Sequence, residues 1–176
     1  MNISELVALT SLVLLALLFA QSAWHKTQDY GRFLGLVANY QLLPRFLEEN
    51  AARGLIVAEV LLVMLFVFPF TATFAALGIG ALLLVYAVAM SVNLLRGHRL
   101  IDCGCGGSAH PVAWTLVLRN LLLAALALLP AIYDTSQPSH LELVVAMLAG
   151  SALWLSYNVL GKIMENNRLL SNLRQT

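Results

Sequence analysis

Long runs of apolar residues with few charges alternate with short polar connections along the whole chain. A helix needs about 20 mostly apolar residues to cross the hydrocarbon core of a bilayer. Several runs are long enough, and Glu59 and Arg119 are the charged residues that lie farthest from the ends of such runs. The predicted membrane-spanning helices cover residues 6–24, 51–69, 71–95, 112–133 and 143–161.

Pro69 separates the second predicted span from the third. No charged residue occurs from Val60 to Leu95, which is too long for one helix, and proline removes a backbone donor and clashes with the preceding turn. Because lipid offers no partner to open backbone groups, the spans must be helical. The predicted fold class is an all-α integral membrane protein, a bundle of about five transmembrane helices in a single membrane domain over residues 1–176.

Composition agrees with this prediction and excludes several classes of function. Of the 176 residues, 60% are hydrophobic and 11% are charged, whereas soluble domains carry about 25% charged residues. The net charge of +1 gives no reason to expect nucleic acid or an acidic substrate as a partner. We expect the first span to be retained rather than cleaved as a signal peptide, because Met1 to Glu5 carry no positive charge.

The connection between the first two spans contains a second kind of pattern. Apolar residues recur there at spacings of three and four, with polar residues between them, in the set Phe33, Leu36, Val37, Tyr40 and Leu43. This pattern predicts an amphipathic helix over residues 30–44, which is too short to cross the membrane and suited to its interface. The other interpretation is a soluble segment that covers one end of the bundle.

Lysine and arginine gather on one side of the predicted bundle. The connections on the other side, near Pro69 and from Asp134 to His140, contain neither residue, and the N-terminus contains neither. Basic residues mark the cytoplasmic side of membrane proteins, so the pattern predicts an N-terminus outside and a C-terminus inside. The basic residues counted on the inside are Lys26, Arg32, Arg45, Arg53, Arg96, Arg99, Lys162, Arg168 and Arg174.

The candidate chemistry is concentrated in the loop over residues 96–111, between the third and fourth spans. The only two cysteines of the sequence, Cys103 and Cys105, are separated by Gly104, whose conformational freedom lets the segment fold tightly. Arg99 and the N–H groups at the start of the next helix favour a thiolate over a thiol, whereas the charge of Asp102 opposes it. The loop is therefore a candidate site for thiol chemistry.

Three interpretations of this loop are open. In the first, Cys103 and Cys105 form a redox pair, because a disulfide across a Cys-Gly-Cys ring is strained and easily passed to another protein. In the second, they bind a metal together with His98, His110 or Asp102, although the spacing matches no standard zinc pattern. In the third, they are only small residues in a glycine turn. We favour the redox pair, because chance rarely places the only two cysteines of a chain two positions apart.

Glu59 and Arg119 lie inside predicted spans, where ionisable residues are costly and usually paired or functional. Both spans start on the side of the cysteine loop, and both residues lie roughly 9–12 Å along their helices from that side. The sequence therefore predicts an ion pair between them beneath the loop. Asn93 and Asn120 either extend this polar layer or bridge helices. The alternative is an arginine that reaches the surface and a protonated glutamate.

These elements together resemble the methylamine-utilisation protein MauE family, which belongs to a wider set of DoxX-like membrane proteins. The resemblance covers most of the chain from Lys26 to Pro130. The Cys-Gly-Cys and Tyr-x-Leu-Leu-Pro elements are specific in combination. The sequence elements that carry the resemblance are Tyr40-x-Leu-Leu-Pro44, Glu59, Asn93-Leu-Leu-Arg-Gly, Ile101-Asp-Cys-Gly-Cys-Gly-Gly107 and Arg119-Asn120.

The resemblance implies a role in maturing a periplasmic enzyme, methylamine dehydrogenase, in the inner membrane of a bacterium. It also implies a membrane-tethered thioredoxin-like partner of the MauD type. The hypothesis is a membrane-embedded dithiol/disulfide carrier that works through Cys103 and Cys105 and assists disulfide formation in the client. A quinone is one candidate for a second electron acceptor.

Two questions stay open at this level. The alternative function is a non-catalytic membrane scaffold, or a metal-binding assembly factor, that docks the thioredoxin-like protein. The second question is the side of the membrane. A periplasmic client requires the cysteines to be reached from the periplasm, whereas the charge pattern places their loop in the cytoplasm.

Overall fold

The computed structural model describes residues 2–97, 113–133, 135 and 138–173. Every regular element within these residues is an α-helix, so the all-α fold class is confirmed for the described part of the chain. The helices are α1 (Ile3–Gln28), α2 (Tyr30–Asn39), α3 (Arg45–Leu65), α4 (Pro69–Leu95), α5 (Trp114–Leu126), α6 (Leu129–Ile132) and α7 (His140–Leu173).

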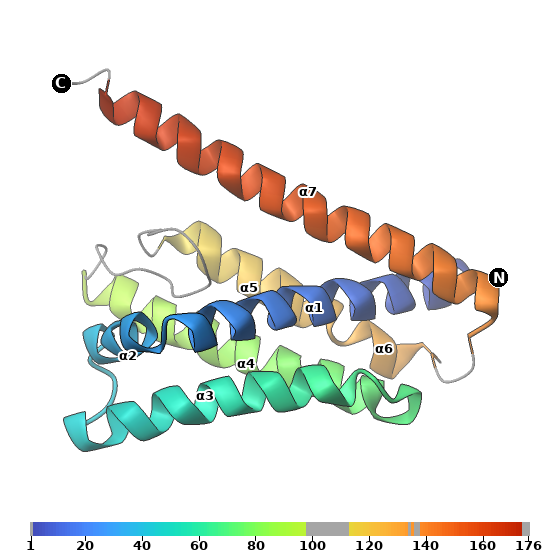
Figure 1. Ribbon diagram of the computed structural model, residues 1–176, viewed down its shortest axis with the longest axis horizontal. Helices are drawn as coiled ribbons and strands as arrows, with labels where there is room; N and C mark the ends of the chain where they lie inside the picture. The colour runs from blue at the N-terminus through green and yellow to red at the C-terminus, as the bar shows by residue number, and fades with distance from the viewer. Residues whose placement is uncertain (1, 98–112, 134, 136–137, 174–176) are drawn as a thin grey trace.

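The long helices run back and forth and form one bundle (Figure 1). Within it, α3 packs against α1 and α4, α4 packs closely against α5, and the short α6 lies beside α1. Helix α7 packs along α1, and its C-terminal half stands away from the rest of the bundle in Figure 1. The core is apolar, with Leu15, Ile79 and Ala127 completely buried.

Apolar side chains also cover the outside of the bundle. Phe70, Phe74 and Val88 on α4 and Leu148 on α7 are among the large apolar side chains that are more than half exposed. Soluble proteins seldom expose so much apolar surface, whereas lipid solvates it. Helices α1, α4, α5 together with α6, and α7 are each long and apolar enough to cross a membrane. These four helices indicate a multi-pass membrane protein.

The predicted spans correspond to α1, α3, α4, the α5–α6 pair and α7. The break at Pro69 is confirmed, because α3 ends at Leu65 and α4 begins at Pro69. Across this turn the Thr71 hydroxyl donates a hydrogen bond to the Leu65 carbonyl at 2.6 Å. Helix α3 is not among the four apolar helices, since charged residues gather in its first half at Arg45, Glu48, Glu49 and Arg53.

Three helices extend beyond the predicted spans. Helix α1 continues to Gln28, one turn beyond residue 24, α3 begins at Arg45 rather than at residue 51, and α7 continues to Leu173 rather than to residue 161. Helix α7 also starts earlier, at His140, because the Glu142 carboxylate accepts a hydrogen bond from the Ser139 N–H at 2.9 Å and caps the first turn. Windows free of charge miss such turns, because helices continue into the polar interface. The 34 residues of α7 extend for about 51 Å, well beyond a hydrocarbon core of about 30 Å.

The helix predicted over residues 30–44 is shorter in the structure. Helix α2 ends at Asn39, and Gln41 has a left-handed backbone with φ of 49°. Pro44 caps the start of α3, and the residue before a proline is disfavoured in helical conformation. The helical spacing of apolar residues therefore continues to Leu43, although the helix itself ends at Asn39.

The fourth predicted span is interrupted. Helix α5 begins at Trp114 and ends at Leu126, and α6 begins at Leu129. Pro130 has no N–H to donate to the Leu126 carbonyl, which breaks the regular ladder of hydrogen bonds at this point. The break was not predicted, although the same argument was applied to Pro69.

Basic residues lie together at one end of the bundle. The C-terminal ends of α1 and α4, the whole of α2 and the N-terminal ends of α3 and α5 meet there (Figure 1). We call this the basic end. Among the described residues, the α3–α4 turn and α6 at the opposite end contain no lysine or arginine. The basic end carries Lys26, Arg32, Arg45, Arg53 and Arg96.

The close packing of α7 on α1 at Gly150 leads to a first prediction. A Cβ atom at Gly150 would lie 2.6 Å from Val13 Cγ1 and 3.2 Å from the Thr10 carbonyl oxygen. We therefore expect Gly150→Ala to lower the free energy of unfolding in detergent by about 1–3 kcal/mol. Gly161→Ala, on the same helix with nothing within 4 Å of its Cβ, is the control and should be neutral or slightly stabilising. Equal thermal unfolding midpoints for the two variants would contradict the predicted contact.

Candidate functional site

A cavity of about 730 Å³ lies at the basic end, between α1, α2, α3, α4, α5 and α7. Much of its lining is apolar, including the rings of Phe19 and Phe33 and the side chains of Leu83, Met90 and Leu116. Sites for small molecules typically combine such a lining with a few polar groups. The polar side chains that line this cavity are Gln21, Ser22, His25, Lys26, Tyr40, Glu59, Tyr86, Thr115, Arg119, Asn120, Tyr157, Asn158 and Lys162.

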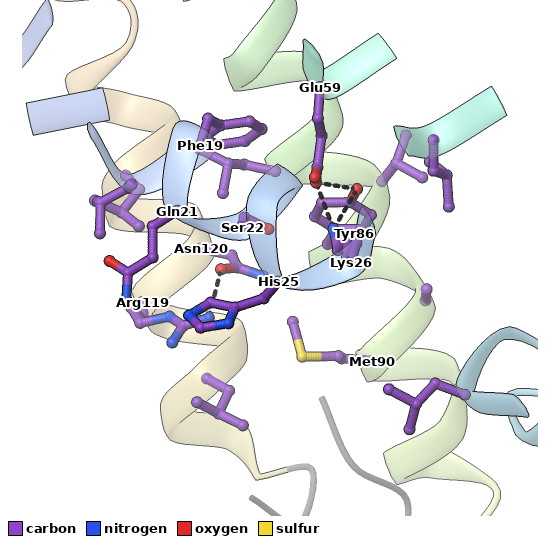
Figure 2. Close-up of a pocket in the computed structure, with 18 of the residues that line it drawn as sticks. Phe19, Gln21, Ser22, His25, Lys26, Glu59, Tyr86, Met90, Arg119 and Asn120 are labelled. Carbon is purple, nitrogen blue, oxygen red and sulfur yellow. Dashed lines mark hydrogen bonds and ion pairs between the residues drawn. The ribbon is translucent and has the colours of Figure 1, made fainter. Parts of the chain in front are cut away.

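One buried ionic cluster is formed by three helices on the α3 side of the cavity. Glu59 of α3 forms an ion pair with Lys26 of α1, and Tyr86 of α4 donates a hydrogen bond to Glu59 Oε1 at 2.7 Å. The Lys26 ammonium also donates to Tyr86 Oη at 3.2 Å. Glu59 is 0% exposed and Lys26 5%, so each charge depends on the other for its stability in the bundle. Figure 2 shows the three side chains meeting at one point.

Aromatic rings complete the surroundings of the Lys26 ammonium. Its nitrogen lies 4.7 Å from the centroid of the Tyr86 ring and 5.0 Å from that of Phe33 on α2, within the range of cation–π attraction. The second carboxylate oxygen of Glu59, Oε2, has no hydrogen-bond partner among the described residues. The cavity is therefore lined by a residue whose buried carboxylate has one oxygen without a hydrogen bond in the described part of the chain.

The predicted ion pair between Glu59 and Arg119 is wrong, because Glu59 pairs with Lys26 instead. The prediction treated Lys26 as a loop residue, whereas α1 continues for another turn and carries it into the bundle. Lys26 extends the spacing of the buried α1 residues Phe19 and Ala23. A spacing of three and four residues thus places Lys26 on the buried face of α1, whereas windows without charge end before this residue.

Arg119 belongs to a second polar cluster, which joins α5 to α7. Its Nη1 donates to Tyr157 Oη at 2.7 Å and its Nη2 to Asn120 Oδ1 at 3.3 Å. Asn120 is 1% exposed, and its Nδ2 has no hydrogen-bond partner in the described part of the chain. In Figure 2, Arg119, Asn120, Gln21 and His25 lie on one side of α1, and Lys26 points to the other. Asn120 and Glu59, which both line the cavity, thus each have a buried polar atom with no hydrogen bond among the described residues.

A chain of hydrogen bonds holds α7 against α1 beside this second cluster. Trp154 Nε1 donates to Gln21 Oε1 at 2.8 Å, and Gln21 Nε2 donates to Asn158 Oδ1 at 2.7 Å. Asn158 Nδ2 in turn donates to the Trp154 carbonyl at 2.8 Å. Buried polar groups satisfied in this way fix the relative position of two helices inside an apolar solvent. The α7 wall of the cavity is therefore positioned by specific bonds.

Comparison with known proteins identifies the family. The family model for "Methylamine utilisation protein MauE" matches residues 4–133. The chain belongs to the MauE family. The matched region contains Lys26, Glu59, Tyr86, Arg119 and Asn120, together with both cysteines, and it ends before α7. The resemblance predicted from the sequence is therefore confirmed.

Individual MauE proteins match most of the chain. The methylamine utilization protein MauE of Paracoccus denitrificans is 39% identical over 156 residues, which are 85% of this chain and 84% of that protein. The MauE protein of Paracoccus versutus is 40% identical over 147 residues, 81% of this chain and 79% of that protein. The MauE protein of Methylophilus methylotrophus is 36% identical over 125 residues. No solved structure matches the chain at a significant level.

The Cys-Gly-Cys element that contributes to the MauE resemblance lies outside the described residues. The described residues on both sides of it belong to the basic end. Arg96 Nη1 donates to the Gln41 carbonyl at 3.3 Å, and Leu42 and Ala113 line the cavity. The connection that carries the cysteines therefore starts and ends beside the cavity. The predicted site residues that lie outside the described part are His98, Arg99, Asp102, Cys103, Gly104, Cys105 and His110.

The structure adds Lys26, Tyr86 and Gln21 to the residues predicted from the sequence. Tyr86 lies among apolar residues of α4. A tyrosine hydroxyl in such a place usually needs a polar partner, so the sequence did contain an indication of its role.

Asn93 is buried, bonds to the Ala89 carbonyl of its own helix at 3.1 Å and does not line the cavity. No group of three or more His, Cys, Asp or Glu side chains suited to a metal occurs within the described residues.

Proposed function

We propose that this chain is a membrane-bound accessory protein of methylamine utilisation that exchanges thiols and disulfides through Cys103 and Cys105. The observation that carries the proposal is the Cys-Gly-Cys element. It holds the only two cysteines of the sequence, in a connection whose described ends adjoin the cavity. A connection with a purely structural role has no need of two thiols separated by a single residue.

Family membership supports the biological setting. The relatives from Paracoccus denitrificans and Paracoccus versutus are both named for methylamine utilisation. The client that we propose is an enzyme subunit that needs disulfides, such as that of methylamine dehydrogenase, and the proposed partner is a thioredoxin-like protein of the MauD type. The chain then works between the partner and the membrane.

The proposed chemistry is a pair of thiol–disulfide exchanges. A thiolate of the reduced partner attacks the Cys103–Cys105 disulfide and forms a mixed disulfide, while the other cysteine of this chain leaves as a thiolate. The second thiolate of the partner then attacks the mixed disulfide, so the partner becomes oxidised and Cys103 and Cys105 both become reduced. Two electrons thus move from the partner to this chain, and each turnover requires the pair to be reoxidised.

The proposed placement in the bacterial inner membrane has five crossings. Helix α3 runs beside α1 and α4, so it crosses with them and keeps its charged first half at the basic end, while α2 lies at the interface. Labelling of the cysteines by an impermeant maleimide in intact cells locates the basic end. Labelling without permeabilisation places it in the periplasm, as a periplasmic client requires. Labelling only after permeabilisation places it in the cytoplasm, as the basic residues predict.

Trapping a mixed disulfide tests the exchange directly. The trap is a partner variant that retains only its attacking cysteine. Its thiolate opens the Cys103–Cys105 disulfide of the wild-type chain, and a covalent complex should accumulate because the partner has no second thiol to break the mixed disulfide. Non-reducing gel electrophoresis of cells that produce both proteins detects the complex, and dithiothreitol should dissolve it. The double serine variant is the control. Absence of a complex between this partner variant and the wild-type chain would contradict the proposed exchange.

A further inference from the structure

We propose that the cavity at the basic end binds the headgroup of a lipid-soluble quinone. The inference deepens the proposed function, because the quinone would reoxidise the cysteine pair, and only this electron-transfer step rests on that function. The binding itself is argued from described residues of the cavity.

Two residues that line the cavity each have a buried polar atom without a hydrogen bond among the described residues. Asn120 Nδ2 is a donor on a side chain that is 1% exposed, and Glu59 Oε2 is an acceptor on a side chain that is 0% exposed. Both residues line the same cavity. Buried polar atoms are nearly always bonded, and leaving them unbonded is costly. A ligand that alternates between a carbonyl, which accepts from Asn120, and a hydroxyl, which donates to Glu59, can bond to each residue in turn.

The shape and the chemistry of the cavity lining also suit a quinone. The rings of Phe19 and Phe33 and the sulfur-containing side chain of Met90 line the cavity, and they suit a flat ring. Leu160 and Met164 of α7 also line it, and they are 60% and 58% exposed. The cavity therefore continues to the apolar outside, where an isoprenoid tail can enter lipid. A volume of about 730 Å³ lies within the range of small-molecule sites.

The polar groups of the cavity favour a quinone over an anionic lipid headgroup. The two cations nearest to the unbonded atoms already have partners, because Lys26 pairs with Glu59 and Arg119 bonds to Tyr157 and Asn120. Two of the buried atoms that have no hydrogen bond among the described residues are a neutral amide nitrogen, on Asn120, and a carboxylate oxygen, on Glu59. A carboxylate oxygen repels a phosphate, whereas it accepts a hydrogen bond from a quinol hydroxyl. These two atoms therefore suit a neutral carbonyl compound better than a phosphate group.

The redox step balances with a quinone as the oxidant. Two S–H bonds, of Cys103 and Cys105, break, and one S–S bond forms. The two electrons and two protons that this releases convert the quinone into a quinol. The Asn120 amide donates to the quinone oxygen before reduction, and Glu59 Oε2 is placed to accept from a hydroxyl after it. The disulfide is then restored for the next partner.

Titration of decylubiquinone into the purified Cys103→Ser/Cys105→Ser variant, followed by tryptophan fluorescence, tests binding without any redox reaction. We expect saturable binding that Asn120→Leu in the same background weakens about five- to tenfold, because one buried hydrogen bond is lost. Asn93→Leu is the matched control, a buried asparagine that does not line the cavity, and it should change the dissociation constant less than about twofold. Glu59→Gln with Lys26→Met provides a second cavity variant that keeps the charges balanced. Because Glu59 accepts only from a hydroxyl, this variant should weaken binding of decylubiquinol rather than of decylubiquinone.

Three results would overturn the inference. They are no saturable binding, equal dissociation constants for the Asn120→Leu and Asn93→Leu variants, and equally tight binding of decanol, which would make the cavity a site for lipid tails. The proposed function is tested separately, by reduction of decylubiquinone by the dithiol form of the wild-type chain. Binding without reduction keeps the quinone site and rejects the electron transfer. Partner oxidation without quinone binding keeps the thiol function and rejects the quinone site.

Discussion

Replacing both cysteines, as Cys103→Ser with Cys105→Ser, is expected to abolish maturation of the client enzyme. A serine hydroxyl forms neither a disulfide nor a mixed disulfide, so no exchange with the partner is possible. Each single variant should fail as well, because one cysteine alone cannot form the disulfide that the partner thiolate attacks. The measurement is methylamine dehydrogenase activity, with the number of disulfides in its small subunit, in cells that carry each variant. Activity in the double variant should fall to that of cells lacking the protein.

The serine variants also separate the proposed function from a scaffold. Serine nearly matches cysteine in size, and the cysteine connection lies outside the predicted spans, so the variants should accumulate in the membrane at wild-type levels. A scaffold that only docks a thioredoxin-like protein needs no thiol and should work normally with serine at both positions. Full client activity in the double variant would therefore reject the redox proposal, and an immunoblot of the membrane fraction controls for loss of the protein.

Much of the fold is predictable from the sequence because the bilayer constrains it strongly. Long apolar runs must form helices in lipid, and Pro69 breaks the longest of them for reasons of covalent geometry. The ends of helices are harder to predict, because helices continue into the polar interface without any apolar signal. Helix α1 passes the last residue of its apolar run and reaches Gln28. That additional turn changes the candidate site, because it carries Lys26.

The site was predicted less well than the fold, for a physical reason. The sequence identifies Glu59 and Arg119 as buried charges, but the choice of partner depends on which helix faces which. Helix α3, with Glu59, lies against α1 and α4, whereas Arg119 on α5 bonds toward α7. Equal depth along the bundle is therefore not enough for two charges to meet. The rotation of each helix about its own axis decides which charges meet. A sequence indicates that rotation only where buried residues recur along one face of the helix without interruption.

Replacing Lys26 by methionine is expected to destabilise the bundle strongly. Methionine fills a similar volume without a charge, so Glu59 keeps only the Tyr86 hydroxyl as a partner while it is 0% exposed. Removing one member of a buried ion pair typically costs about 3–5 kcal/mol. The measurement is the free energy of unfolding of the purified chain in mixed micelles, followed by tryptophan fluorescence as the denaturing detergent is increased.

Two further variants show whether burial of the charge is the cause. Glu59→Gln in the Lys26→Met background removes the unpaired charge, so most of the lost stability should return. Arg53→Met breaks another ion pair of α3, with Glu49, in which the side chains are 64% and 55% exposed. Exposed pairs contribute about 0–1 kcal/mol, so this control should stay close to the wild type. If Lys26→Met and Arg53→Met lost equal stability, or if Glu59→Gln restored none, the buried pair would not be what holds α1, α3 and α4 together at the cavity.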